Sequence, residues 1–298
     1  MTWDLLATVV VPVKDDERVY RLADSLRRQT LPHDRYEVIV VENGSRRFGD
    51  LAAAGDVIRY LRLPEANSAT ARNAGLAAAR GRYLLLTDAD CVADPSWIER
   101  MTAALQEGSA SVVGGVIRPY APRTWTQRYA ITIVDGQDRL NYLPALHLPY
   151  VAGANAGFVT DRLREVGGFD EDLRSGNDVD VCYKLGLAGC SAAIAHDAVV
   201  WHEDRPTVRA HFRRFRFYAT YQVLLFAKYK QHSGKRLVLD RYPFRRAAQA
   251  ILDGPRAAAR LVRGDAGPAS RMLLQLIEAA GVLAGEIEGA VRFRQPYL

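Results

Sequence analysis

The chain has 298 residues and is 49% apolar, which suffices for one large domain or for one domain with an appendage. Its three cysteines cannot form a closed disulfide framework, its start lacks a signal-peptide pattern, and no apolar run approaches the roughly 18 residues that cross a bilayer. These features argue against a disulfide-stapled secreted scaffold and a membrane-spanning protein, and we expect a cytoplasmic protein.

The net charge of +6 is unevenly distributed along the chain. Residues 1–204 hold 22 Lys and Arg against 28 Asp and Glu, a net charge of −6, whereas the remainder holds 18 against 6, a net charge of +12. A basic tail of this kind can meet phosphates, acidic lipid headgroups or nucleic acid, or it can form a solvated face. Composition does not choose among these.

Apolar runs alternate with helical patterns in the first 117 residues. The valine-rich run Ala7–Val13 predicts a strand covered on both faces, and a helical stretch follows it. The alternation favours an α/β core with a largely parallel sheet. Further strands are predicted at Tyr36–Val41, Val57–Leu63, Tyr83–Thr87 and Ser111–Ile117, with helices at Ser68–Arg80 and Pro95–Glu107.

The pattern is looser in the next part of the chain and then becomes helical. The segment Val151–Thr160 is followed by a predicted helix over Asp178–Gly189 and by the apolar run Ala198–Trp201. Three helices are predicted in the basic region, at His211–Lys230, Pro243–Arg263 and Pro268–Glu288; the first interleaves aromatic residues with arginines.

The last predicted helix carries an apolar stripe along one side. Gly281, Gly285 and Gly289 repeat every four residues and permit close helix contact. The stripe is expected to pack on the rest of the protein or on a second subunit.

Polar residues follow three of the predicted strands, in the segments Val13–Asp16, Glu42–Ser45 and Thr87–Asp90. Ligands of open α/β sheets bind at the carboxyl ends of strands, so these residues are candidates for a site. Asp88 and Asp90 are two residues apart and can serve one cation, because alternate residues of an extended segment point the same way. One or two carboxylates with substrate phosphates are a usual Mg²⁺ arrangement, and a pair of solvated turn aspartates is the alternative.

Four other features have both a functional and a structural explanation. Arg72 lies near the start of a helix, where it could meet a diphosphate or be an ordinary surface arginine. Gly153–Phe158 allows a tight turn or close approach to a ligand. Asp178 follows Asn177 at a predicted helix start, so it could cap the helix or act as a general base. His202 could be structural or could contact metal or phosphate.

These motifs, in this order, resemble those of the inverting family-two glycosyltransferases of GT-A fold, over roughly Ala7 to His202. The segments that carry the resemblance are Val11–Lys14, Glu42–Ser45, Ala71–Gly75, Asp88–Asp90, Gly153–Phe158 and Asn177–Asp178. The resemblance implies an α/β fold with a Rossmann-like, mixed, mostly parallel sheet and a helical C-terminal extension. Residues 1–204 would be the catalytic domain, with nucleotide-sugar binding in 1–117 and the acceptor side in 118–204, and 205–298 would be a basic helical region.

The resemblance also implies roles for individual residues. Asp178 would be the catalytic base, and Asp90 would ligate Mg²⁺ or Mn²⁺ with His202 as a further ligand. The residues implied to bind the nucleotide sugar are Pro12, Val13, Asp15, Glu42, Asn43, Arg72, Asp88, Ala89, Gly153, Ala154, Asn155 and Asn177. The implied reaction is a single in-line displacement by an acceptor hydroxyl or another nucleophile, with inversion of configuration.

Two departures from the family pattern bear on the substrate. Many relatives have aspartate where this chain has Glu42, which leaves the nucleotide open, with a UDP-sugar favoured over a GDP- or dTDP-sugar. The usual Glu-Asp is replaced by Asn177-Asp178, which keeps the implied base. The implied acceptor is a glycan, a lipid-linked molecule, a peptide or a small molecule, and no nucleic-acid partner is expected.

The basic region suggests two further contacts. Its charge, and the aromatic residues within 211–230, make peripheral contact with the inner membrane face a minority hypothesis. A homodimer through the C-terminal helical stripe is the other.

Two rival functions remain open at this stage. Leu84–Val92 also resembles the apolar strand and Asp-x-Asp of haloacid-dehalogenase-type phosphatases and phosphotransferases. That motif normally ends the first strand of its core, whereas three strand-like segments precede it here. A noncatalytic nucleotide- or glycan-binding protein is the other rival, and it would tolerate replacement of Asp178.

Overall fold

The computed structural model describes residues 3–45, 57–64, 67–134, 137–143, 146–233 and 240–297. The chain divides into two compact units. The first, called the sheet unit below, comprises residues 1–120, 136–141 and 148–202; the second, the helical unit, comprises residues 121–135, 142–147 and 203–298. This division departs from a single boundary after residue 204, because residues 121–135 and 142–147 group with the C-terminal region.

The sheet unit is built on a mixed sheet with strand order β3-β2-β1-β4-β9-β6-β10-β5 among the described residues. Parallel pairing joins β3 to β2, β2 to β1, β1 to β4 and β6 to β10, whereas β9 is antiparallel to β4 and β6, and β5 to β10. The mixed, mostly parallel sheet predicted from the sequence is confirmed. The strands are β1 (Leu5–Val13), β2 (Tyr36–Asn43), β3 (Ile58–Leu63), β4 (Gly81–Thr87), β5 (Cys91–Ala93), β6 (Val112–Pro119), β9 (Asn155–Val159) and β10 (Ala192–His202). A separate two-stranded sheet consists of β7 (Asn141–Leu143) and β8 (Leu146–Tyr150).

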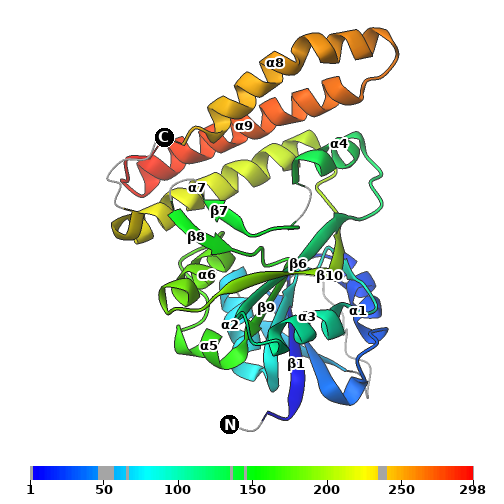
Figure 1. Ribbon diagram of the computed structural model, residues 1–298, viewed down its shortest axis with the longest axis vertical. Helices are drawn as coiled ribbons and strands as arrows, with labels where there is room; N and C mark the ends of the chain where they lie inside the picture. The colour runs from blue at the N-terminus through cyan, green and yellow to red at the C-terminus, as the bar shows by residue number, and fades with distance from the viewer. Residues whose placement is uncertain are drawn as a thin grey trace. The chain divides into compact units, whose positions relative to one another are not determined.

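Helices cover both faces of the large sheet (Figure 1). Side chains of β1 alternate between the faces: Val9 and Val11 pack in one apolar cluster, and Val10 packs in the other. The first cluster includes residues of α1 (Arg18–Arg27) and α3 (Trp97–Gln106), and the second includes residues of α2 (Ser68–Ala78), α5 (Thr160–Glu165) and α6 (Asn177–Leu187). The sheet is therefore the middle layer of three.

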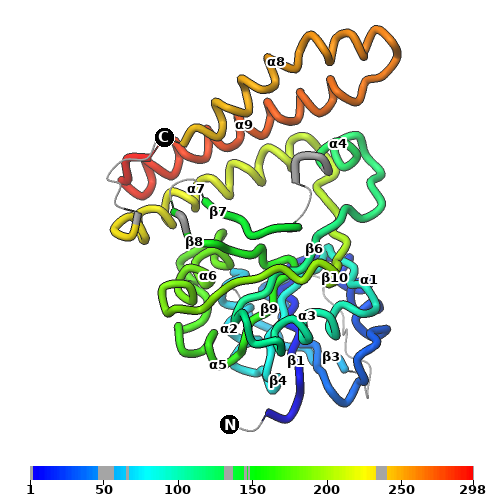
Figure 2. The backbone as a smooth tube through the Cα atoms, viewed as in Figure 1, coloured from blue at the N-terminus to red at the C-terminus, as the bar shows by residue number. Residues whose placement is uncertain are grey.

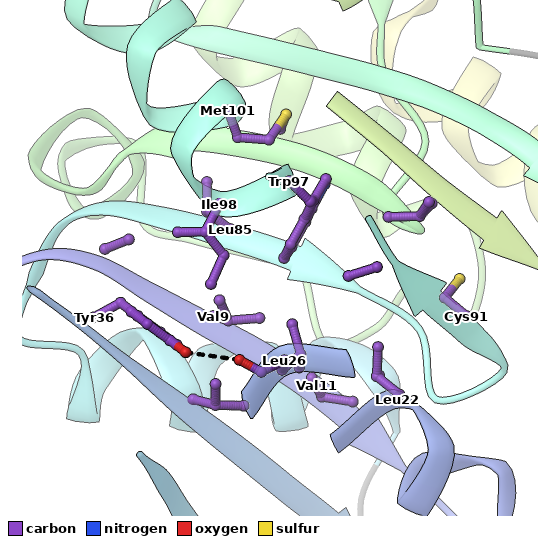
Figure 3. Packing of buried hydrophobic residues seen from close by; sticks show 14 of the residues in the cluster. Val9, Val11, Leu22, Leu26, Tyr36, Leu85, Cys91, Trp97, Ile98 and Met101 are labelled. Atoms are coloured by element: carbon purple, nitrogen blue, oxygen red, sulfur yellow. Dashed lines mark hydrogen bonds between the residues drawn. The ribbon is translucent and has the colours of Figure 1, made fainter. Parts of the chain in front are cut away.

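The first cluster is closed by large side chains, as Figure 3 shows. Trp97 and Ile98 of α3 are fully buried, and so is Leu22 of α1. The Tyr36 hydroxyl donates a hydrogen bond to the Leu26 carbonyl at 2.7 Å, so this buried polar group is satisfied where α1 crosses β2. A short 3₁₀ helix, His33–Arg35, leads into β2.

Most predicted elements lie within a few residues of the observed ones, but Val151–Thr160 is a strand only over Asn155–Val159. The preceding residues form a loop held by Gln137. The Gln137 carboxamide donates to the Asn155 carbonyl at 2.7 Å and accepts a hydrogen bond from the Ala152 amide. These side-chain bonds replace strand pairing at this point, and they let the loop leave the sheet.

The helical unit contains α4 (Trp125–Val134), α7 (Val208–Ser233), α8 (Tyr242–Val262) and α9 (Gly267–Arg292). Helix α9 contacts the other three, and the tube in Figure 2 shows α8 and α9 as an antiparallel pair. Side chains added at Gly281, Gly285 and Gly289 would collide with backbone or side-chain atoms of α7. The glycine spacing noted in the sequence therefore allows α9 to pack closely on α7.

Among the helices that the structure describes, none combines the length and the apolar character needed to cross a membrane.

Candidate active site

Three parallel strands, β2, β1 and β4, end at the same edge of the sheet. Glu42 at the end of β2 pairs in register with Val13 at the end of β1. Asp88 directly follows β4, and antiparallel β9 begins with Asn155 opposite Thr87. The three polar strand ends picked out in the sequence and the loop that precedes β9 therefore meet at one edge, which is where such sheets bind ligands.

Glu42 holds the turn that follows β2. Its side chain is fully buried and accepts a hydrogen bond from the Ser45 amide, while its other oxygen lies 2.9 Å from Nε of Arg62. The Ser45 hydroxyl in turn accepts a hydrogen bond from the Asp15 amide at 2.9 Å. Asp15 has a φ of +48°, a left-handed conformation that the bond to Ser45 helps to hold. These contacts fix the loops after β1 and β2 relative to each other.

Arg72 of α2 reaches toward Asp88 and the start of α6. Its Nη2 lies 3.3 Å from Oδ1 of Asp88, and its Nη1 donates to Oδ1 of Asn177. The Asn177 amide group also donates to Ser68 Oγ at 3.1 Å. Arg72 is buried, and arginines are rarely buried unless they are paired. Its guanidinium lies 5.9 Å from the centre of the Phe169 ring. Residues from three separate segments are thereby fixed around one cation.

Asp178 lies in the first turn of α6 and faces the loop before β9. Its Oδ2 accepts a hydrogen bond from the Gly153 amide at 2.8 Å, and its Oδ1 accepts one from the Val179 amide at 3.0 Å. A Cβ atom at Gly153 would lie 2.5 Å from Nη2 of Arg72. Gly153 thus lies against both a carboxylate and a guanidinium, and a side chain at this position would displace the Arg72 guanidinium.

Asp90 lies beside His202 because β5 pairs with β10, which places Cys91 opposite His202. The distance from Asp90 Oδ1 to His202 Nε2 is 3.5 Å. The other carboxylate oxygen of Asp90 lies 3.4 Å from Nη2 of Arg18, which also pairs with Asp16 at 2.7 Å. The two residues that the resemblance gave as metal ligands are therefore neighbours, and Arg18 joins them.

Asp88 lies within the field of the whole cluster. Withdrawal from water raises the pKa of Asp88, and the Arg72 guanidinium acts to lower it. The carboxylates of Asp90 and Asp178 raise the pKa of Asp88, and His202 lowers it, so the net shift is upward. Although its side chain is 38% exposed, Asp88 is thus influenced by the charges of Arg72, Asp90, His202 and Asp178.

Within the described residues, no group of three or more His, Cys, Asp and Glu side chains is arranged to hold a metal ion. Asp90 and His202 are a pair, with Asp88 nearby but directed to Arg72. A protein pair of this kind matches the arrangement in which a divalent cation takes its remaining ligands from substrate phosphates and water.

Asn155 differs from the other residues expected to bind the nucleotide sugar. Its side chain is fully buried, accepts a hydrogen bond from the Trp97 indole at 2.8 Å, and donates to the carbonyls of Val116 and Ala198 at 2.9 and 3.0 Å. All of its polar atoms are engaged beneath the edge of the sheet, so the structure gives Asn155 a supporting position.

The remaining predicted residues differ in their access to solvent. Asp15 is exposed, the catalytic candidate Asp178 is half-buried, and Asp90 is buried. The half-buried ones are Pro12, Asp88, Ala154 and His202, and the other buried ones are Val13, Glu42, Asn43, Arg72, Ala89, Gly153 and Asn177.

Two residues of the site were missed by the sequence analysis. Arg18 occupies the first turn of α1, where a cation is unfavourable because it lies beside the positive end of the helix dipole. An arginine at such a position indicates a role other than helix stability, and this could have identified Arg18 from the sequence. Gln137, which positions the loop before β9, lies in a segment without a clear pattern and gave no such signal.

Comparison with known proteins identifies the family. The family described as Glycosyl transferase family 2 matches residues 8–167, more than half of the chain. The pre-mycofactocin glycosyltransferase of Mycobacterium tuberculosis is 30% identical over 219 residues, which cover 71% of this chain and 45% of that relative. Glycosyltransferase AglE of Haloferax volcanii is 30% identical over 222 residues, which cover 70% of each chain. The chain thus spans less than half the length of the first relative.

Solved structures support the same fold. The mannosyltransferase PcManGT from Pyrobaculum calidifontis, in complex with GDP-Man and Mn²⁺, matches with a TM-score of 0.60 and 20% identity over 96% of this chain and 90% of that one. S. aureus TarS 1-349, in complex with UDP, matches with a TM-score of 0.51 and 17% identity over 98% and 92%. None of these matches supports the phosphatase alternative. The resemblance seen in the sequence is confirmed: the chain belongs to glycosyltransferase family 2 and has the GT-A fold.

Proposed function

We propose that the sheet unit transfers a sugar from a nucleoside-diphosphate sugar to an acceptor hydroxyl in one displacement, with inversion and with help from a divalent metal. The observation that carries this proposal is the arrangement at Gly153, where the Asp178 carboxylate and the Arg72 guanidinium both lie against one glycine. A proton acceptor and a cation for a leaving phosphate are both needed for such a transfer, and here they are fixed a short distance apart.

Asp178 is the proposed base. The amides of Gly153 and Val179 each donate to one of its oxygens, which sets the orientation of the carboxylate before an acceptor arrives. A carboxylate oxygen can accept two hydrogen bonds, so each oxygen keeps a position for the acceptor hydroxyl. The half-buried side chain can be reached from solvent, as a group that deprotonates an incoming acceptor must be.

Arg72 and Asp88 are proposed to hold the diphosphate side of the donor. An arginine can bind phosphate oxygens through two parallel hydrogen bonds. The contacts to Asp88 and Asn177 hold the planar guanidinium in one orientation. The leaving nucleoside diphosphate becomes more negative as its bond to the sugar breaks. A fixed cation beside it therefore stabilises the transition state more than the ground state.

Asp90 and His202 are proposed to bind Mg²⁺ or Mn²⁺ together with the donor diphosphate. The fit rests on their 3.5 Å separation and on the position of Asp88 beside them. A cation bound there would neutralise charge on the departing nucleoside diphosphate. The neighbour that was solved with GDP-Man and Mn²⁺ is consistent with this choice.

The nucleotide base is proposed to lie against the loops after β1 and β2, near Pro12, Val13, Asp15, Glu42 and Asn43. Both oxygens of Glu42 are already engaged, by Ser45 and by Arg62, so its main effect is to shape the pocket. A UDP-sugar is the first donor to test, with GDP- and dTDP-sugars as the comparison, since the structural neighbours bind UDP and GDP-Man.

The test is a thermal-shift series with UDP-, GDP- and dTDP-sugars, each with Mn²⁺ and with EDTA. A ligand that binds the native state raises the unfolding temperature, and we expect a rise for one nucleotide class only when metal is present. Hydrolysis or transfer of that donor, followed by NMR of the anomeric proton, then reports the configuration. A product that retains the donor's configuration, or no shift with any donor, would contradict the proposal.

A further inference from the structure

Helix α8 of the helical unit has one buried side. Pro243, Ala250 and Ala257 are its buried residues, and they are spaced by seven positions. Residues spaced by seven lie on one side of a helix, and this side faces α9, which runs along α8 (Figure 1). The contact uses small side chains, so the large side chains of α8 must lie elsewhere.

Large apolar residues are exposed on another side of α8. Phe244 is 52% exposed, Ile251 73%, Leu252 72% and Val262 89%. At about 100° per residue, they lie roughly 100 to 200° around the helix from Ala250. Single exposed apolar residues are common on proteins, but four large ones along one side of a helix form a patch that calls for a partner.

Arginines border this apolar row. Arg245, Arg256 and Arg263 are exposed and lie about 220 to 240° around the helix from Ala250. Within the described parts of the chain, no ion pair involves these three arginines. Arg260, a little further round, pairs with Asp265 at 2.9 Å. Three cations therefore lie beside the apolar row, and none of them forms an ion pair with a residue that the structure describes.

We propose that this exposed side of α8, called the α8 face (Phe244, Arg245, Ile251, Leu252, Arg256, Val262 and Arg263), binds the surface of an anionic lipid bilayer. An apolar row with adjacent arginines is typical of helices that lie in the plane of a membrane, with the apolar side chains in the headgroup boundary and the arginines on lipid phosphates. The face extends from residue 244 to 262, about 27 Å at 1.5 Å per residue.

The charge of the α8 face favours a lipid bilayer over a second copy of the chain as its partner. A symmetric contact between two α8 faces would bring two rows of arginines to the edges of one apolar contact, where like charges repel. The exposed apolar residues of α9, among them Leu273, Ile287 and Val291, are interspersed with the acidic Glu288. The α8 face combines an apolar row with a basic row, and an acidic surface complements it.

The sequence suggested membrane contact through the aromatic residues of 211–230, which lie in α7, whereas the structure favours α8. Within α7, Val223, Leu225, Phe226 and Tyr229 are buried. Phe217 and Tyr218 are the exceptions in this segment, at 43% and 50% exposed, whereas Ile251, Leu252 and Val262 of the α8 face are 73%, 72% and 89% exposed. The α8 face therefore offers the more accessible apolar surface.

The test uses the intact chain and flotation with two kinds of vesicle, one of phosphatidylcholine alone and one of equimolar phosphatidylcholine and phosphatidylglycerol. Two double variants probe the face: Ile251→Gln with Leu252→Gln, and Arg245→Gln with Arg256→Gln. The matched controls are Ile287→Gln with Val291→Gln on α9, and Arg209→Gln with Arg213→Gln on α7, which are also exposed. Circular dichroism checks that each variant is folded.

We expect the intact chain and both controls to float with anionic vesicles only, and each α8 double variant to bind about tenfold or more weakly. The arginine variant leaves the apolar row intact and tests the proposal even if the apolar variant fails to fold. Absence of binding by the intact chain, or equal loss in the α7 control, would overturn the proposal. So would unchanged vesicle binding in an apolar α8 variant that converts a dimer into a monomer, since the face would then be a subunit interface.

Discussion

Two buried carboxylates, Glu37 of the sheet unit and Glu286 of the helical unit, have pKa values shifted in opposite directions. In the sheet unit, burial raises the pKa of Glu37, but hydrogen bonds from Arg59, Arg80 and Thr8 outweigh it, so the pKa is lowered. Arg59 and Arg80 lie 2.6 and 2.9 Å from its Oε2. In the helical unit, burial raises the pKa of Glu286 to about 9, and the neighbouring Asp240 adds to the rise.

The difference shows that a perturbed carboxylate is by itself a weak marker of chemistry. Asp88 in the sheet unit and Glu286 in the helical unit both have raised pKa values, but Asp88 is surrounded by a guanidinium, an imidazole and two carboxylates. Glu286 has a single like-charged neighbour among the causes of its shift. We infer that the sheet unit contains the chemistry and that Glu286 affects only stability. Four predictions test this separation.

The largest effect is expected for Asp178→Asn. The amide keeps the shape of the side chain but cannot accept a proton, so transfer should fall by roughly 10²- to 10⁴-fold. Donor binding should change little, because Asp178 faces the acceptor side of Gly153. The measurement is the single-turnover rate alongside donor affinity by calorimetry. Asp161→Asn, in the first turn of α5, is the matched control. Full transfer activity in the Asp178 variant would remove it as the base.

A smaller effect is expected for Asp90→Ala. Loss of this carboxylate should weaken metal-dependent donor binding by about tenfold or more, and donor binding measured in EDTA should be the same as in the unchanged protein. Titration of the nucleotide at several Mn²⁺ concentrations measures both. If the two proteins respond identically to Mn²⁺, Asp90 does not hold the metal.

Gly153→Ala tests the arrangement on which the proposed function rests. The new methyl group would lie 2.5 Å from Nη2 of Arg72, so Arg72 must move away from Asp88. We expect donor affinity to fall roughly tenfold, since small displacements of positioning groups have large effects. Gly186→Ala is the control in the same unit, because its methyl group would only reach Leu148 at 3.8 Å. Equal donor affinity in both variants would show that Arg72 does not need this position.

The sequence predicted the sheet and the three polar strand ends because they depend on local signals. A valine-rich run such as β1, with Glu42 and Asp88 directly after neighbouring strands, identifies a ligand-binding edge before any tertiary contact is known. The resemblance to family two then supplied Asp178, which lies far from these strands in the chain.

Other parts of the site depend on tertiary contacts that no local pattern reports. Asn155 was grouped with the ligand-binding residues because the resemblance to family two implied it, but residues of β6, β10 and α3 form hydrogen bonds with its side chain. Gln137 could not be recognised for the same reason. The exposure of the α8 face was likewise hidden, since the sequence of a helix does not show which of its sides a neighbouring helix covers.

The smallest effect is expected from Glu286→Gln, and it should be on stability alone. The pKa of Glu286 is raised from an ordinary value of 4.5 to about 9 in the folded state, so the folded chain binds more protons than the unfolded chain between these values. Its stabilising contribution is therefore complete below about pH 4.5 and declines as the pH rises toward 9. Glutamine has the same shape and no charge, so the variant should lose this decline. Its melting temperature should exceed that of the unchanged protein by several degrees or more at about pH 9. Glu288→Gln on the same helix, which removes an exposed pair with Arg216, is the control. The inference that Glu286 affects stability alone would be contradicted by a loss of transfer activity in the Glu286 variant. It would also be contradicted if the melting temperatures of the variant and the unchanged protein changed with pH in the same way.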